Sequence, residues 1–167
     1  MPVVVSDSSP LIYLSKLDCF DLLEKLYGEI IVPGAVWREV ADRGAHLPEG
    51  ENAKNGRDAG WIKVVQVDPP LVESPPGEDP FGAGEAEAIT LAKNNGYKLI
   101  IDELLGRQVA RELGIMIIGT VAVFVEAKNQ KLIEAVKPLL DRLRSETNFR
   151  LSEAIYQAIL NRAGEDG

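Results

Sequence analysis

Acidic side chains are the residues of this chain best suited to chemistry. Asp7 follows a run of three valines, Asp102 and Glu103 follow a longer apolar segment, and Glu39 and Glu85 lie in segments with helical patterns. Carboxylates brought together raise one another's pKa, so such a cluster is stable when a divalent cation lies among them. Oxygen ligands without cysteine or histidine suit Mg²⁺ or Mn²⁺. An ion held in this way can support phosphodiester hydrolysis.

Asp7 also has a purely structural interpretation. Pro10 is well placed for the first turn of a helix that follows the valines, and aspartate is a good N-cap. Ser8 or Ser9 could cap the same helix without an acid. On this stretch alone, helix capping and a role in a functional site are both open.

The elements that position these acids alternate between strand and helix. The pattern predicts strands at residues 3–5, 29–32, 61–67, 97–101 and 115–118. It predicts helices after Pro10 and at residues 18–27, 34–41, 84–95, 104–113, 121–130, 133–145 and 152–163, with a loop holding at most a short helix at 44–60. This alternation indicates an α/β three-layer sandwich with a central, mostly parallel sheet of four or five strands. The acids after two of the strands then lie at the carboxyl edge of the sheet, where ligands bind.

Length and composition favour one globular domain. The 167 residues are predicted to form a single domain, with a C-terminal helical extension at about 146–167. No apolar run reaches the length of a membrane span, and no secretory signal is apparent, so a cytoplasmic protein is expected. Cys19 cannot form an internal disulfide, and His46 has no second histidine or cysteine nearby, which argues against zinc.

The charge is unevenly distributed. The net charge is −8, which argues against broad, non-specific binding of nucleic acid through a basic surface. Residues 1–90 carry 7 basic and 16 acidic side chains, whereas residues 91–167 carry 11 and 10. This asymmetry is compatible with a metal site beside an anion-binding edge, and ordinary solvated surfaces explain it equally well.

Three further polar residues are candidates for supporting roles. Thr120 follows the last predicted strand and is a candidate helix N-cap, although a hydroxyl at a strand end can also hold a water or a phosphate. Arg107 and Arg111 lie one helical turn apart and could contact RNA phosphates. Surface salt bridges are the commoner fate of such arginines.

Four segments resemble the motifs of a known family. In chain order they are Asp7-Ser8-Ser9-Pro10-Leu11-Ile12, Val36-Trp37-Arg38-Glu39-Val40, Gly84-Glu85-Ala86-Glu87-Ala88-Ile89 and Leu99-Ile100-Ile101-Asp102-Glu103-Leu104-Leu105-Gly106-Arg107. Together they resemble a PIN domain over about residues 3 to 145. The greatest similarity is to the prokaryotic PIN-like subgroup of predicted nucleic-acid-binding proteins, which is related to the toxin ribonucleases of type II toxin–antitoxin pairs.

The resemblance implies a Mg²⁺- or Mn²⁺-dependent ribonuclease with an acidic site. Asp7 matches the first acid of the family, Glu39 the second, and Glu85 takes the place of the third, which is often aspartate. For the fourth acid, alignment with the following residues favours Glu103, whereas strand-end geometry favours Asp102. Ser9 matches the small hydroxyl residue that supports the first acid.

Other functions and partners are also compatible with the sequence. A PIN-like protein with weak or no nuclease activity would bind nucleic acid or a partner such as an antitoxin over the same groove. A phosphatase-like enzyme with Asp7 as nucleophile is disfavoured, because that chemistry usually wants a second aspartate where Ser9 stands. The expected partners are single-stranded RNA, an antitoxin-like protein and a second copy of the chain. The apolar run 121–125 could serve as a dimer contact or belong to the core.

Overall fold

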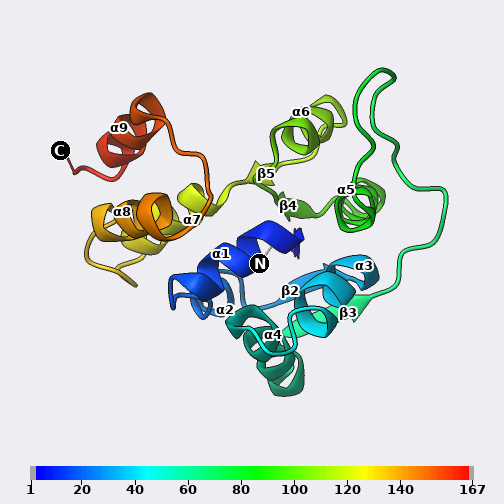
Figure 1. Ribbon diagram of the computed structural model, residues 1–167, viewed down its shortest axis with the longest axis horizontal. Helices are drawn as coiled ribbons and strands as arrows, with labels where there is room; N and C mark the ends of the chain where they lie inside the picture. The colour runs from blue at the N-terminus through cyan, green and yellow to red at the C-terminus, as the bar shows by residue number, and fades with distance from the viewer. Residues whose placement is uncertain (1–2, 166–167) are drawn as a thin grey trace.

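The fold is built on a parallel sheet of five strands in the order β3-β2-β1-β4-β5 (Figure 1). The computed structural model describes residues 3–165. The strands are β1 Val4–Ser6, β2 Ile30–Pro33, β3 Ile62–Val65, β4 Lys98–Ile100 and β5 Ile117–Ile118. All four strand pairings are parallel, and β3 and β5 form the two edges. The predicted three-layer α/β architecture is confirmed.

The central strand β1 is buried on both faces, as its β-branched sequence predicts. Val4 and Val5 are each 0% exposed and point to opposite sides of the sheet, because successive side chains of a strand alternate. Val4 belongs to one hydrophobic cluster and Val5 to another. The sheet therefore separates two cores, each of which needs a covering layer of helices.

More helices cover one face of the sheet than the other. The helical segments are α1 Ser8–Lys16, α2 Leu22–Tyr27, α3 Gly34–Trp37, the π-helical segment η1 Arg38–Asp42, α4 Pro48–Ala59, α5 Ala83–Asn95, α6 Leu104–Glu112, α7 Thr120–Asn129, α8 Lys137–Glu146 and α9 Glu153–Arg162. The helices α5 and α6 contribute to the core around Val5, while α1, α2, α4, α7, α8 and α9 contribute to the core around Val4. Among the described residues, no helix is long and apolar enough to cross a membrane.

Two predicted elements differ from the sequence analysis. The segment 44–60 contains the twelve-residue helix α4, where a loop with at most a short helix was expected. Its buried residues are Glu49 and the small residues Gly50, Ala53 and Gly56, so the usual pattern of large apolar side chains is missing. The helix that was expected to begin at Asp18 begins at Leu22 instead, because Asp18 has a φ of 58°.

The apolar run at the start of α7 belongs largely to the core. Val123, Phe124 and Val125 are at most 5% exposed, and Val121 and Ala122 are half-buried. Of the two interpretations of this run, packing within the chain is the one seen here. These side chains support α7, whose first residue contacts the acidic site described next.

Candidate active site

The predicted acids lie at the edge of the sheet where the strand order reverses, between β1 and β4. From β1 the chain adds β2 and β3 on one side, and then returns to add β4 and β5 on the other side. The carboxyl ends of β1 and β4 are joined by a hydrogen bond from the Asp7 N–H to the Ile100 carbonyl oxygen, at 3.0 Å. Such a switch point is where open α/β sheets form their binding crevice.

Asp7 lies at the centre of this edge and is buried. It occupies the N-cap position of α1, but its carboxylate forms no capping hydrogen bond with that helix, so the interpretation as a simple cap is wrong. Its side chain is 6% exposed. Burial raises the pKa of Asp7 to about 7, the charges of Glu39, Asp102 and Glu103 add to the rise, and the Ser8 N–H offsets part of it. Either protonation of Asp7 or a nearby cation offsets the cost of this burial.

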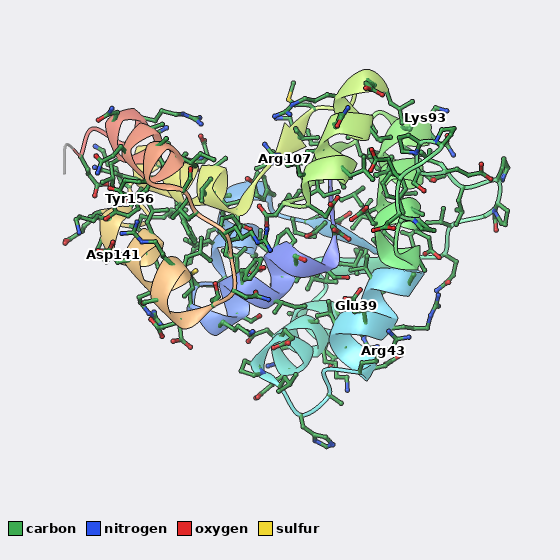
Figure 2. The ribbon with its side chains drawn as sticks, turned by 45° about the horizontal axis from the view of Figure 1, so that its top comes forward. Glu39, Arg43, Lys93, Arg107, Asp141 and Tyr156 are labelled. Carbon is green, nitrogen blue, oxygen red and sulfur yellow. The ribbon has the colours of Figure 1, made fainter. Side chains whose placement is uncertain are left out.

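Glu39 is held by Ser8 across the start of α1. The Ser8 hydroxyl donates a hydrogen bond of 2.7 Å to Glu39 Oε2. Glu39 is exposed and lies on η1 (Figure 2), and π-helical turns are frequent at functional sites. Gly84 packs beside this pair, since a Cβ there would lie 3.4 Å from Ser8 Oγ and 3.6 Å from Glu39 Oε2. The neighbouring Ser9, expected as the supporting hydroxyl, is half-buried on α1.

Glu85 and Glu103 face each other across Gly106. A Cβ at Gly106 would lie 3.3 Å from Glu85 Cδ and 3.4 Å from Glu103 Oε2, so this glycine leaves the space that the two carboxylates border. Burial raises the pKa of Glu85 to about 7, and the charges of Asp7 and Glu103 contribute. Glu103 also caps α6, because its Oε2 accepts a 2.7 Å hydrogen bond from the Gly106 N–H. Its charge acts on both Asp7 and Glu85.

Asp102 is fixed by the first residue of α7. Its Oδ1 accepts from the Thr120 N–H at 2.8 Å, and its Oδ2 accepts from the Thr120 hydroxyl at 2.5 Å. Burial raises the pKa of Asp102, while Thr120 and the charge of Arg107 oppose the rise. Thr120 is thus not the N-cap, which is Gly119, and its hydroxyl supports an acid of the cluster. Asp102 and Glu103 both lie at the site, with different partners.

The two arginines of α6 lie one helical turn apart and differ in exposure. Arg107 is half-buried, and its Nη1 donates a 2.8 Å hydrogen bond to the Ile101 carbonyl oxygen (Figure 2). Arg111 is exposed. Within residues 3–165, neither forms an ion pair by a 4.0 Å criterion, which leaves Arg111 available to an anion.

Glu87 points away from the cluster, as expected from its spacing from Glu85. Its Oε1 accepts a 3.0 Å hydrogen bond from the Ala35 N–H, and its Oε2 lies 4.0 Å from Arg38. Glu87 therefore ties α5 to α3. It serves below as a matched control for the acids of the site.

The side chains of the site are of the type that binds a hard cation, but they do not enclose a metal-binding position. Within the part of the chain that the structure describes, no three acidic, histidine or cysteine side chains are close enough together to hold a metal ion as they stand. The mutual effects on pKa nevertheless place Asp7, Glu85 and Glu103 within electrostatic reach of one another. All the available side-chain donors in the cluster are oxygens, which fits Mg²⁺ or Mn²⁺.

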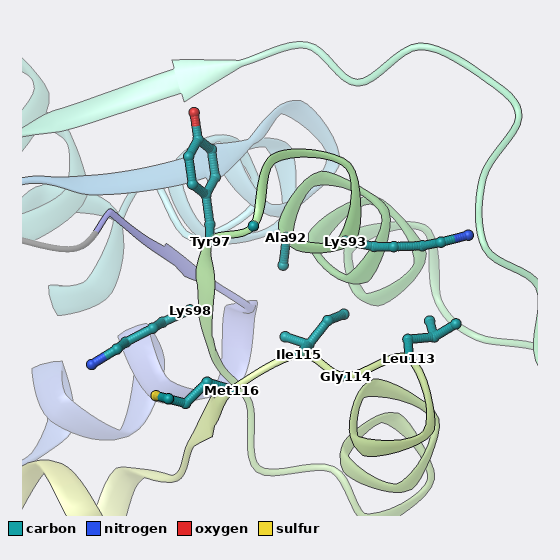
Figure 3. A pocket seen from close by; sticks show the side chains of 9 residues that line it. Ala92, Lys93, Tyr97, Lys98, Leu113, Gly114, Ile115 and Met116 are labelled. Carbon is teal, nitrogen blue, oxygen red and sulfur yellow. The ribbon is translucent and has the colours of Figure 1, made fainter.

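A separate pocket lies at the opposite end of β4 and β5 (Figure 3). Its volume is about 320 Å³, and its lining residues are Ala92, Lys93, Gly96, Tyr97, Lys98, Leu113, Gly114, Ile115 and Met116. None of these is acidic. The side chains of Lys93 and Lys98 point in opposite directions in Figure 3, so they do not converge on one ligand. The acidic edge remains the better candidate for chemistry.

Fold and site together define a three-layer α/β protein with clustered carboxylates at the switch point of its sheet. The family model described as DUF3368, a PIN domain, matches residues 3–165, and the chain belongs to this family. PIN domains are usually nucleases, and they generally use divalent metal ions. The match includes α9, which lies beyond the residues covered by the sequence resemblance.

Comparison with solved structures finds a similar protein from the archaeon Sulfolobus solfataricus P2, a PilT N-terminus domain protein. The two chains share 17% identity with a TM-score of 0.47, over 89% of this chain and 99% of the other. No curated protein matches the chain.

Proposed function

We propose that the protein is a metal-dependent endoribonuclease that hydrolyses phosphodiester bonds of single-stranded RNA at this edge. The observation that carries the proposal is Asp7, a buried carboxylate that is influenced by the charges of Glu39, Asp102 and Glu103 and whose side chain makes no capping hydrogen bond to α1. Such an arrangement costs free energy unless a cation compensates it. Family membership supports a role with nucleic acid.

The residues of the site divide into ligands and supports. The Mg²⁺ or Mn²⁺ ion would be held by the acids of the site, which are Asp7, Glu39, Glu85, Asp102 and Glu103. The bound ion supplies Lewis acidity and charge neutralisation for phosphodiester hydrolysis. Ser8 orients Glu39 and Thr120 orients Asp102 through the hydrogen bonds described above. Arg111, which is exposed, would contact the phosphates of the substrate, and the half-buried Arg107 would add positive charge one helical turn away.

The test is cleavage of an end-labelled, mixed-sequence single-stranded RNA by the purified protein. We expect internal cuts with Mg²⁺ or Mn²⁺ and none in EDTA. Internal cuts distinguish endonuclease from exonuclease activity, since an exonuclease shortens the RNA from one end. Cleavage that persists unchanged in EDTA would contradict the proposed mechanism.

Ser8 is predicted to matter more than Ser9. Ser8→Ala removes the hydrogen bond to Glu39 and should lower cleavage by about tenfold or more, because groups that orient metal-site carboxylates typically contribute 10- to 100-fold. Ser9→Ala, the matched control on the next residue, should change cleavage less than about twofold by the same reasoning. The measurement is initial rate at saturating Mn²⁺. Equal losses of activity in the two variants, or a larger loss for Ser9→Ala, would contradict this prediction. Such a result would favour Ser9, the residue that matches the family motif, as the supporting hydroxyl.

A second candidate is a PIN-like binding protein with weak or no nuclease activity. It is favoured by the lack, among residues 3–165, of three ligands close enough to hold a metal ion. The occupant of the site would then be nucleic acid or a partner such as an antitoxin-like protein or a second copy of the chain. RNA binding without cleavage in any metal would favour this candidate.

A further inference from the structure

An aromatic pair joins the C-terminal part of the chain to α1. The rings of Tyr13 and Phe149 lie 5.2 Å apart between centroids at an interplanar angle of 82°, an edge-to-face contact. The Tyr13 hydroxyl donates a 3.1 Å hydrogen bond to Asn148 Oδ1. Residues 147–152, which connect α8 to α9, therefore pass alongside the helix that begins next to Asp7 (Figure 2).

Tyr13 lies on α1, the helix that begins directly after Asp7. Burial raises the pKa of Tyr13, and the charge of Asp102 adds to the rise, so the phenol is within electrostatic reach of that carboxylate. Asp102 is itself fixed at the first turn of α7, and α1 and α7 share one hydrophobic core. The helix α1 therefore leads from Asp7 in the acidic site to Tyr13 in the aromatic pair.

The surface around the pair is polar and is held in place. Tyr13 and Phe149 are half-buried, whereas Asn148 and Arg150 are exposed. The Phe149 N–H donates a 3.1 Å hydrogen bond to the Thr147 hydroxyl, which in turn donates to the Leu143 carbonyl oxygen at 2.5 Å. The connection is therefore preorganised by the end of α8, which lowers the entropy cost of binding.

We propose that Tyr13, Asn148 and Phe149 form a binding site for one unpaired base of a single-stranded nucleic acid, beside the acidic site. The inference rests on the proposed function, since it places the strand that the site would cut. Aromatic side chains stack with unpaired bases, and the Asn148 amide N–H groups can donate to a base edge. Arg150 supplies a positive charge for the adjacent phosphate. A base within a duplex is already stacked and paired, so a duplex cannot use this site.

The test is equilibrium binding in EDTA, where no metal-dependent cleavage occurs. The probe is a short single-stranded RNA that contains 2-aminopurine, whose fluorescence falls when the base stacks. We expect quenching by the wild-type protein, and Phe149→Leu should weaken binding by about tenfold. Tyr97→Leu, which changes a half-buried aromatic residue at the opposite pocket, should leave binding unchanged. Asn148→Ala alters an exposed side chain and provides a second variant if Phe149→Leu does not fold.

The outcomes separate this site from the proposed function. If the wild-type protein binds and quenches the probe but cuts no RNA in any metal, the nuclease proposal fails and the base site stands. If it cuts RNA and both variants keep wild-type Kd and KM, the base site is wrong and the nuclease stands. Equal binding of duplex RNA, or no binding of single strands, also overturns the base site. The same binding measurement with single-stranded DNA shows whether the sugar contributes to recognition.

Discussion

Replacement of Asp7 with asparagine is expected to abolish metal-dependent RNA cleavage while the fold is kept. The change is isosteric and removes the negative charge at the centre of the carboxylate cluster, so the affinity for a divalent cation and the rate should both fall by at least about a hundredfold. The fold should persist because an amide resembles the neutral carboxyl group that burial favours at this position. Initial rates over a range of Mn²⁺ concentrations measure the effect.

The matched control is Glu87→Gln, also an isosteric change of an acid near the same sheet edge. Glu87 accepts its hydrogen bond from Ala35 and points away from the cluster, and the glutamine carbonyl oxygen can accept the same bond. The cleavage rate of this variant should stay within about twofold of wild type, because the change keeps the size of the side chain and the hydrogen bond from Ala35. Full activity in Asp7→Asn, or equal losses in both variants, would contradict the assignment of Asp7 as a metal ligand.

The same Asp7 variant should be more stable than the wild-type protein at neutral and alkaline pH when metal is absent. Burial and neighbouring acids raise the pKa of Asp7 from 3.8 to about 7, so the folded state favours the neutral carboxyl. That contribution to stability is fully present below pH 3.8 and is lost as the pH rises through about 7. The full difference is on the order of 4 kcal/mol, at about 1.4 kcal/mol per pH unit.

Urea unfolding in EDTA at a series of pH values tests this expectation. The free energy of unfolding of Asp7→Asn relative to wild type should rise by a few kcal/mol as the pH increases from 3.8 to about 7, and should level off above about pH 7. Comparing the two proteins at each pH removes the contributions of other titrating groups. Mn²⁺ should stabilise the wild-type protein, because a ligand that binds only the folded state stabilises it. The difference in free energy of unfolding between the variant and the wild type should then become smaller. A difference in free energy of unfolding that is constant across the pH range would show that Asp7 does not titrate as described.

The sequence determined the sheet and the approximate place of its acids. Buried parallel strands are short apolar runs, and the side chains that follow them must lie at the carboxyl edge, so Asp7 and Asp102 could be placed from local pattern alone. The divergence of Glu85 and Glu87 followed from helical geometry in the same way. These features depend on nearest neighbours along the chain, which a sequence displays directly.

Other features depended on packing between distant segments. The helix α4 was not predicted because its buried side carries two glycines, which local propensity disfavours in helices, and no large apolar side chain, whereas close packing makes the glycines suitable. A Cβ at Gly56 would lie 2.5 Å from Ile62 Cδ1, so the small residue is required by β3 rather than by the helix itself. Propensity is a weak prior that tertiary contacts override.

The supports of the site were decided by tertiary structure alone. Ser8 and Ser9 are indistinguishable as residue types, and only the position of Glu39 on η1 makes Ser8 the partner. The contact of Tyr13 with Phe149 joins the first helix to the last connection of the chain. Local periodicity carries no information about such pairs, because their approach depends on how whole elements pack on the sheet. The sequence by itself therefore determined which side chains could do chemistry, and the tertiary structure decided which residues support and orient those side chains.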